Sequence, residues 1–244
     1  MAIESMAIDR PRSTIVSFDC ASTLLATDYS PEGFALRAAA LAGLDPTPDA
    51  ESVYRSLYHA RFAEYTRLNT AGDASEIQRF WVVLTREWAA RCGMPDQEER
   101  LLEAAEKLLY SLEHRYFSLY DDVIPCLETL RAEGYRMIVL SNWDYTLHRV
   151  LEAADLARFF ERTFASLEFG CEKPDPRFFR FAESELGLSA EAFVHVGDRE
   201  DDDLEGAAAA GWRALLIERG RGETVLPRLN SLADLPEALR SATF

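Results

Sequence analysis

Residues with reactive side chains follow four short apolar runs of the sequence. Asp19 comes directly after one run, Ser141 and Asp198 follow two others, and Lys173 lies in the loop after a fourth. Two carboxylates can hold a hard divalent cation, and a cation together with an ammonium group neutralises a phosphate. A carboxylate can also act as a nucleophile. These residue types therefore predict phosphate chemistry, provided that the fold brings them together.

The second half of the chain has the pattern of a parallel sheet. After about residue 119, short apolar segments alternate with amphipathic ones, which predicts strands and helices in a sheet covered on both faces. Such sheets bind ligands at the carboxyl ends of their strands. The reactive residues are thus expected at one edge of the sheet. The expected strands are 13–18, 135–141, 162–166, 192–197 and 212–218, and the expected helices are 122–134, 146–154, 176–187 and 203–211.

Further helices are expected between the first strand and this pattern. Ser30 and Thr47, each followed by proline, are typical helix starts, and Ser75 is the expected N-cap of a third helix. The expected fold class is α/β, a Rossmann-like parallel sheet core with an inserted all-helical domain of four helices. The expected bounds are 1–27 and 119–244 for the core and 28–118 for the insertion, with helices at 30–41, 47–68, 75–93 and 95–117.

The acidic composition excludes some partners. The chain has 244 residues, a net charge of −16 and a pI of about 4.7. A surface of this sign repels nucleic-acid backbones and anionic membranes, so neither is expected as a partner. A small phosphorylated substrate is compatible with it, because a local cation reverses the field at one site. The sequence leaves the oligomeric state open.

The cysteines and the first residues favour a cytoplasmic location. The four cysteines form no C-x-x-C pair and are too few for a disulfide framework, and Cys20 and Cys171 are expected to be small buried packing residues. The opening segment MAIESMAIDRPRS has no apolar core of signal-peptide length, and no apolar run is long enough to span a bilayer.

Four motifs resemble those of the haloacid dehalogenase (HAD) superfamily. They are, in order, FDCASTL, VLSNWD, CEKPDP and VGDREDDDLEGA, each at an expected strand end or in the loop after one. The helical insertion resembles the type C1 cap of that superfamily. The resemblance implies a hydrolase that requires Mg²⁺, forms a covalent aspartyl intermediate and acts on a small molecule, most readily a phosphorylated one.

The resemblance also implies roles for individual residues. Asp19, Ser141 and Lys173 would be catalytic, with Asp19 as the nucleophile. The metal ligands would be Asp19, the backbone carbonyl of Ala21, Asp198 and Asp203, and Asp203 could also pair with Lys173. Thr23, Asn142 and Trp143 would lie near the substrate or brace the loops around it.

Other polar residues near the motifs have simpler explanations. His195 lies inside an apolar strand and is expected to be packed rather than catalytic. Asp201 and Asp202 are expected at a solvated helix start, where the helix dipole favours acids, although Asp202 could serve as a shifted metal ligand.

Ala21 is a departure from the pattern. Phosphatases of the superfamily usually carry a second aspartate at this place, which protonates the leaving group. General acid catalysis is typically worth about 10²–10⁴-fold, and alanine cannot supply it. A phosphatase would then need good leaving groups, such as acyl or aryl phosphates, or an acid from the insertion. The candidates for that acid are His59, Glu64 and His114.

Three alternatives to a phosphatase stay open. A 2-haloacid dehalogenase needs no such acid, and Arg37, Arg55 or Arg61 could bind the substrate carboxylate, but dehalogenases generally lack the metal-binding acid at Asp198. A phosphonatase would need a lysine in the insertion, and the only candidate, Lys107, is expected to face solvent. A catalytically silent ligand-binding protein is the third alternative.

Overall fold

The computed structural model describes residues 14–241 except 28, 112 and 115. The strands of its main sheet are β1 (Ile15–Phe18), β4 (Arg136–Ser141), β5 (Arg162–Ala165), β6 (Phe193–Gly197), β7 (Arg213–Ile217) and β8 (Arg228–Leu229). Their order is β5-β4-β1-β6-β7-β8, and every neighbouring pair is parallel. The predicted Rossmann-like α/β core is confirmed.

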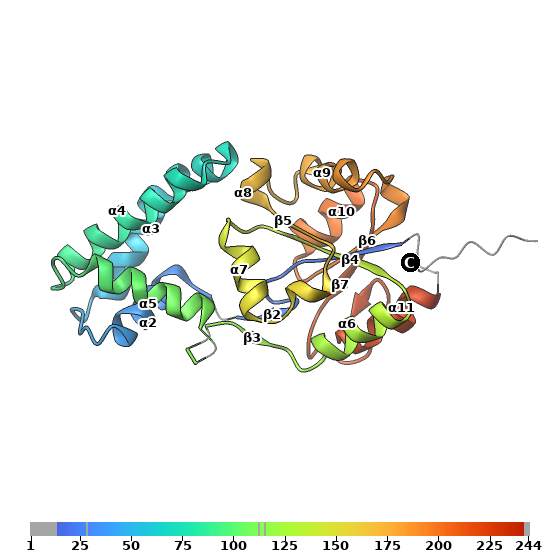
Figure 1. Ribbon diagram of the computed structural model, residues 1–244, viewed down its shortest axis with the longest axis horizontal. Coiled ribbons are helices and arrows are strands. Elements are labelled where there is room, and N and C mark those ends of the chain that lie inside the picture. Colours follow the sequence, from blue (N-terminus) through green and yellow to red (C-terminus); the bar gives the residue numbers. More distant parts are fainter. Residues whose placement is uncertain (1–13, 28, 112, 115, 242–244) are drawn as a thin grey trace, which may run out of the picture.

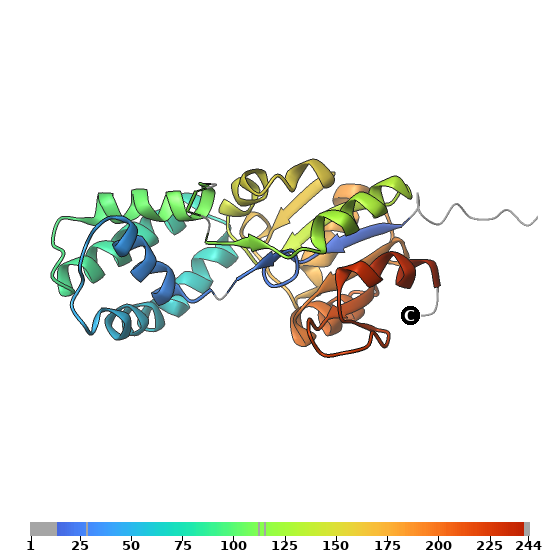
Figure 2. The same cartoon turned by 90° about the horizontal axis from the view of Figure 1, so that it is seen from below.

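Helices cover both faces of this sheet. Alternate residues of a strand point to opposite faces, so Val16 and Phe18 of β1 belong to one apolar cluster and Ile15 to another. The first cluster packs against one set of helices and the second against another set, on the opposite face (Figures 1 and 2). The first set is α6 (Val123–Ala132), α7 (Thr146–Ala153) and α11 (Leu235–Ser241), and the second is α9 (Pro176–Leu186) and α10 (Gly206–Ala209).

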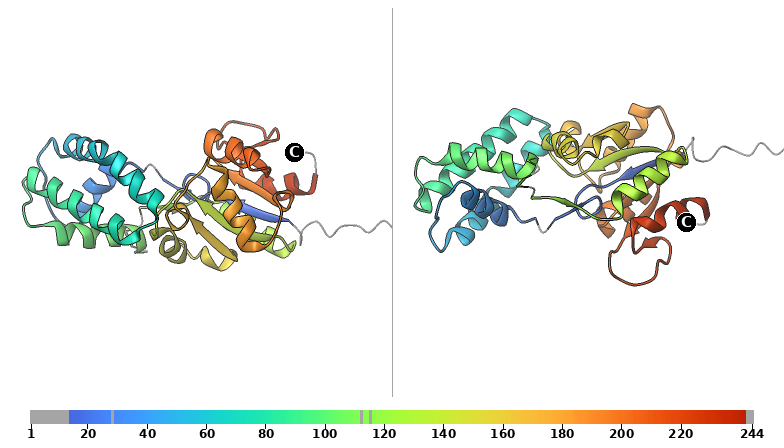
Figure 3. Two further views of the ribbon diagram at one scale, coloured as in Figure 1. Left: turned by 90° about the horizontal axis from the view of Figure 1, so that it is seen from above. Right: turned by 60° about the horizontal axis from the view of Figure 1, so that its bottom comes forward.

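Four further helices form a body beside the sheet, at the carboxyl ends of its strands (Figures 1 and 3). They are α2 (Pro31–Leu41), α3 (Ala50–Ala71), α4 (Ala74–Arg91) and α5 (Glu98–Tyr110). Ile77, Leu84 and Trp88 lie in a buried cluster built mostly from these helices. The chain leaves and re-enters the sheet layer through an antiparallel pair, β2 (Leu25–Ala26) and β3 (Ser118–Leu119).

The predicted helix starts are confirmed in one case and wrong in two. Ser30 caps α2, and its Oγ accepts a hydrogen bond from the Gly33 N–H at 3.0 Å. The second helix begins at Ala50 rather than near Thr47. The third is capped by Asp73 instead of Ser75, because the Asp73 carboxylate accepts the N–H groups of the first helical turn.

Several short elements were not predicted. They include β2, β3, β8, α11 and a one-turn helix, α8 (Ser166–Phe169). The helix expected at 203–211 begins earlier, as a π-helix over Glu200–Glu205, and the helix expected at 95–117 ends at Tyr110. Within the described part of the chain, no helix is both long and apolar enough to cross a membrane.

We expect Leu84→Ala to destabilise the helical body. Leu84 is 0% exposed, and truncating a buried leucine leaves a cavity that typically costs about 2–5 kcal/mol of unfolding free energy. Urea unfolding of the purified variant measures this loss. The neighbouring Val83, 36% exposed, supplies the control: Val83→Ala should change the unfolding free energy by no more than about 0.5 kcal/mol. Equal losses in the two variants would contradict the packing described for α4.

Candidate active site

Asp19 follows the central strand and is almost completely buried. Its side chain lies at the carboxyl end of β1, and its N–H donates to the carbonyl of Val196 at 2.9 Å. Its Oδ1 accepts hydrogen bonds from Ser141 Oγ at 2.9 Å and from Lys173 Nζ at 2.7 Å. Burial raises the pKa of Asp19, although the charge of Lys173 opposes this rise. The three predicted catalytic residues therefore meet at one point.

Lys173 is buried between two carboxylates. Its ammonium donates to Asp19 and to Asp203. Burial alone would lower the pKa of Lys173, but the charges of both aspartates raise it, so the side chain stays protonated. Asn142 braces the backbone here: the Lys173 N–H donates to its Oδ1 at 2.7 Å, and its Nδ2 donates to the Lys173 carbonyl at 2.9 Å.

Asp203 is held by donors on both of its oxygens. Oδ1 accepts from Lys173 and from His195 Nε2 at 3.0 Å, and Oδ2 accepts from the Arg199 N–H at 2.9 Å. Burial alone would raise the pKa of Asp203, but Lys173 and His195 hold it well below its usual range. A Cβ at Gly197 would lie 2.1 Å from the Asp203 Cγ. Only glycine at this position leaves room for the carboxylate.

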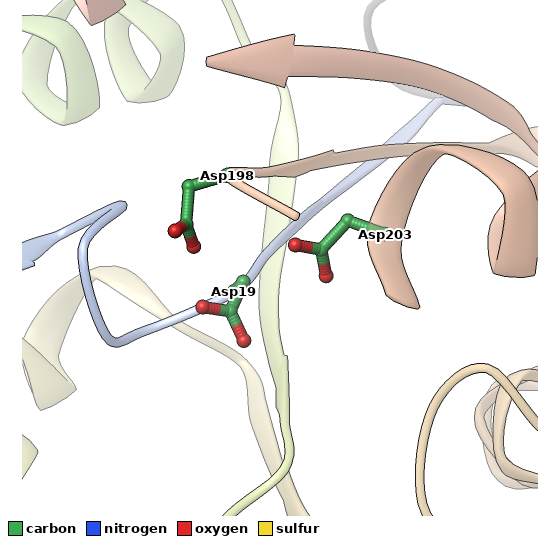
Figure 4. Close-up of side chains that lie close together, drawn as sticks. All are labelled: Asp19, Asp198 and Asp203. Atoms are coloured by element: carbon green, nitrogen blue, oxygen red, sulfur yellow. The ribbon is translucent and has the colours of Figure 1, made fainter. Parts of the chain in front are cut away.

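Asp198 completes a group of three acids. Asp19, Asp198 and Asp203 each offer an oxygen, and these oxygens lie within 4.8 Å of one another; the three side chains lie close together (Figure 4). Burial is the main cause that raises the pKa of Asp198 to about 6, and the charges of Asp19 and Asp203 add to it. Lys173 is the one ammonium bound to this group in the described chain, so negative charge is in excess. Oxygen donors with excess negative charge fit a hard divalent cation.

The turn after Asp19 leaves the carbonyl of Ala21 without a donor in the described part of the chain. The Cys20 carbonyl accepts from the N–H groups of Leu24 and Leu25, both at 2.9 Å, and the Ser22 N–H donates to Leu25 at 2.8 Å. These bonds close the turn, with Ser22 in the left-handed region at φ 58°. Among the described residues, none donates to the Ala21 carbonyl. That oxygen is therefore available as the predicted metal ligand.

Thr23 and Trp143 contact protein groups. Thr23 is 0% exposed, and its Oγ1 has no hydrogen-bond partner among the described residues. Trp143 packs on Phe117, with ring centroids 5.2 Å apart, and its Nε1 donates to Thr146 Oγ1 at 2.9 Å. Asn142, as described above, braces Lys173. Substrate contact by these three residues stays a prediction.

The contacts of Arg219 and Asn69 around the site were not predicted from the sequence. Arg219 donates to the carbonyl of Thr23 at 2.8 Å and to Asp122 at 2.6 Å, and so holds the turn after Asp19. Asn69, near the end of α3, donates to Glu172 Oε2 at 3.2 Å and links the helical body to the loop of Lys173. Both join segments far apart in the sequence, so local patterns carried no signal for them.

The residues named for the alternative chemistries either contact other groups or are exposed. Arg55 and Arg61 form ion pairs with glutamates, and Arg37 lies over a tyrosine ring. Lys107 is exposed on α5, as predicted. Four residues considered as acids or as a metal ligand have other environments: His59, Glu64 and His114 are exposed, and Asp202 pairs with Arg199. All four cysteines are buried free thiols, as expected for Cys20 and Cys171.

The chain belongs to the haloacid dehalogenase-like hydrolases. That family matches residues 14–211. A glyceraldehyde 3-phosphate phosphatase of Methanopyrus kandleri is 31% identical over 209 residues, which cover 83% of this chain and 81% of the relative. A phosphoserine phosphatase of Thermus thermophilus is 33% identical over 175 residues, or 71% of this chain and 68% of the relative. The protein is therefore a hydrolase of this family, and two of its relatives are named phosphatases.

Solved structures agree on the fold. A 2-haloacid dehalogenase from Pseudomonas syringae superposes with a TM-score of 0.65 and 24% identity, over 94% of this chain and 99% of the other. At this identity the likeness concerns the fold alone.

We expect Lys173→Met to destabilise the protein strongly, in the presence of a metal chelator. Removing the ammonium leaves Asp19 and Asp203 buried without their cation, and breaking a buried ion pair in this way costs about 3–5 kcal/mol. Without Lys173 the pKa values of both acids rise, so the folded variant takes up protons that the unfolded chain does not bind. Its deficit relative to wild type should therefore shrink as the pH falls from 7.5 to 5.

Urea unfolding at the two pH values checks this expectation. Lys107, the only other lysine of the chain, is the matched control, because Lys107→Met removes an exposed ammonium and should leave the stability nearly unchanged. A deficit for Lys173→Met that is absent, or that grows as the pH falls, would show that the ammonium is not the partner of these acids.

Proposed function

We propose that the protein is a Mg²⁺-dependent phosphohydrolase that acts on a phosphorylated small molecule through an aspartyl intermediate. One observation carries the proposal: a buried ammonium, Lys173, is bound between Asp19 and Asp203, with Asp198 alongside. The ammonium and a divalent cation bound by Asp19 and Asp198 would together neutralise a phosphate placed beside a carboxylate nucleophile.

Asp19, Ser141 and Lys173 have different roles in the proposed reaction. The carboxylate of Asp19 attacks phosphorus, a new P–O bond forms, and the bond to the leaving oxygen breaks. Water then attacks the aspartyl phosphate, which releases inorganic phosphate and regenerates the carboxylate. Ser141 and Lys173, both bound to Asp19 Oδ1, keep the nucleophile oriented, and the Lys173 charge opposes the charge of the phosphoryl group.

Mg²⁺ would be held by Asp19, Asp198 and the carbonyl of Ala21. When bound, the ion would supply charge stabilisation for the phosphoryl oxygens. Asp203 is also part of the acidic group. The two oxygens of Asp203 already accept hydrogen bonds from Lys173, His195 and the Arg199 N–H. We therefore assign Asp203 to holding Lys173 rather than to binding the metal ion.

The helical body would act as a cap, with the bounds 28–118. It lies beside the carboxyl ends of the strands (Figure 1), and α3 already contacts the Lys173 loop through Asn69 and Glu172. Closure of such a cap would exclude water while the ester is cleaved. The phosphatase names of the relatives from Methanopyrus kandleri and Thermus thermophilus support a small phosphorylated substrate.

We expect Asp19→Asn to abolish phosphate release and Ala21→Asp to increase it. The asparagine amide is a poor nucleophile. The new aspartate would supply the acid that protonates the leaving group, a contribution typically worth about 10²–10⁴-fold. Its benefit should depend on the substrate: large for alkyl phosphates, whose alkoxide needs a proton, and small for aryl phosphates with acidic phenols.

Phosphate release by the three proteins, across a series of aryl and alkyl phosphates, measures this dependence. Turnover that survives in Asp19→Asn would rule out the aspartyl intermediate. Release of chloride from a 2-haloacid without Mg²⁺ would replace the proposal with dehalogenation. Silence toward every phosphate, with Mg²⁺ still bound, would favour a ligand-binding protein.

A second expectation concerns the metal. Asp198→Asn should raise the Mg²⁺ concentration needed for half-maximal phosphatase activity, because an amide oxygen carries no charge for the cation. Asp201→Asn is the control, since Asp201 is exposed and pairs with Arg199 instead. Titration of both variants with Mg²⁺, after removal of metal by a chelator, gives the two values. The proposed ligand set is wrong if both variants titrate like the wild type.

A further inference from the structure

Two polar side chains lie in the buried centre of the sheet. Ser17 of β1 and His195 of β6 are both 0% exposed, and they are register partners on neighbouring strands. The Oγ of Ser17 lies 2.9 Å from the Nδ1 of His195. Other side chains of these strands are apolar, and a buried polar pair is costly unless its hydrogen bonds are complete. The role of this pair is therefore inferred from the second hydrogen-bond partner of His195.

That partner is Asp203, at the edge of the candidate active site. Nε2 of His195 lies 3.0 Å from Asp203 Oδ1. An ionised carboxylate can only accept, so Nε2 carries the hydrogen, and in the neutral ring Nδ1 then accepts from the hydroxyl of Ser17. The hydroxyl, the ring and the carboxylate thus form a chain of hydrogen bonds with one direction, which starts inside the sheet and ends at the site.

The imidazole ring of His195, in the middle of this series of hydrogen bonds, has little freedom to move. Phe179 contacts it edge to face, with centroids 5.7 Å apart, and Trp212 lies on another side at 6.4 Å. His195 therefore presents a donor at a fixed place to the same oxygen, Asp203 Oδ1, that holds the Lys173 ammonium. The remaining oxygen of Asp203 is held by the backbone N–H of Arg199.

We infer that His195, aligned by Ser17, is a positioning residue: it fixes the carboxylate of Asp203, and this carboxylate holds the Lys173 ammonium against the nucleophile Asp19. Loss of the donor at Nε2 leaves Asp203 Oδ1 with Lys173 alone, so only the Arg199 N–H on Oδ2 still orients the carboxylate, and the ammonium is held less firmly. The structural part of the inference stands by itself, whereas its kinetic part rests on the proposed phosphatase function.

Glutamine and methionine at position 195 provide a matched pair of variants. The two side chains have similar length and shape, but glutamine carries an N–H donor near the place of Nε2 and methionine carries a methyl group. His195→Met should lower kcat by about 10- to 100-fold, the usual cost of losing an orienting partner, with KM for an aryl phosphate little changed. His195→Gln should recover most of the loss. Thermal unfolding confirms that both variants are folded.

Equal losses of kcat in the two folded variants would overturn the inference, because packing alone would then explain the histidine. Ser17→Ala adds a second comparison: it should lower kcat in the wild type, but have no further effect in His195→Met, where there is no ring to align. Additive effects of the two substitutions would also overturn it.

A spectroscopic measurement separates this inference from the proposed function. The chain has four histidines, so the imidazole nitrogens of ¹⁵N-labelled wild-type protein can be assigned by NMR. His195 should show the Nε2–H tautomer, and Ser17→Ala should change the Nδ1 shift, whether or not the protein hydrolyses any phosphate. An Nδ1–H tautomer, or a ring that averages between tautomers, would overturn the inference even in an active enzyme.

Discussion

The burial of Lys173 between two carboxylates is the interaction on which the rest of the site depends. Removing charged groups from water costs several kcal/mol per ion, and only close and well-oriented partners offset this cost. Lys173 is 3% exposed and Asp203 is 1% exposed, so neither can turn to solvent for compensation. The surrounding residues follow from this need: Asn142 fixes the Lys173 backbone, and Gly197 leaves space for the Asp203 carboxylate.

The parallel sheet makes this arrangement possible. β1 lies between β4 and β6, so Ser141 at the end of β4 reaches Asp19 at 2.9 Å, and Asp198 after β6 offers an oxygen within 4.8 Å of an Asp19 oxygen. A purely structural ion pair would balance its charges. This site instead keeps a third acid, Asp198, whose pKa burial and its acidic neighbours raise to about 6. Unbalanced charge at such a place is typical of functional sites, and it distinguishes this cluster from the paired surface charges elsewhere in the chain.

The sequence predicts the parts of the molecule that local rules determine. Alternating strands and helices fix the sheet, and the sheet brings Asp19, Ser141, Lys173 and Asp198 to one edge. The sequence predicts less well where two neighbouring residues could play the same local role. Asp73 and Ser75 can both cap α4, and the closer fit of the carboxylate to two N–H groups decides between them. The partners of His195 and Asn142 come from distant segments, so their orientation depends on the assembled fold.

If the protein is a phosphatase as we propose, Ala21 separates the electrostatic part of the site from its proton transfer. Ala21 takes part in the turn only through its backbone. Its carbonyl accepts no hydrogen bond from any described residue. An aspartate side chain at this place is therefore not needed to hold Asp19, Lys173 or the acidic group. Under the proposed function, alanine at this place leaves the charge-stabilising groups intact and removes only a proton donor. In such a site the leaving group, rather than the affinity for phosphate, would decide which esters are cleaved.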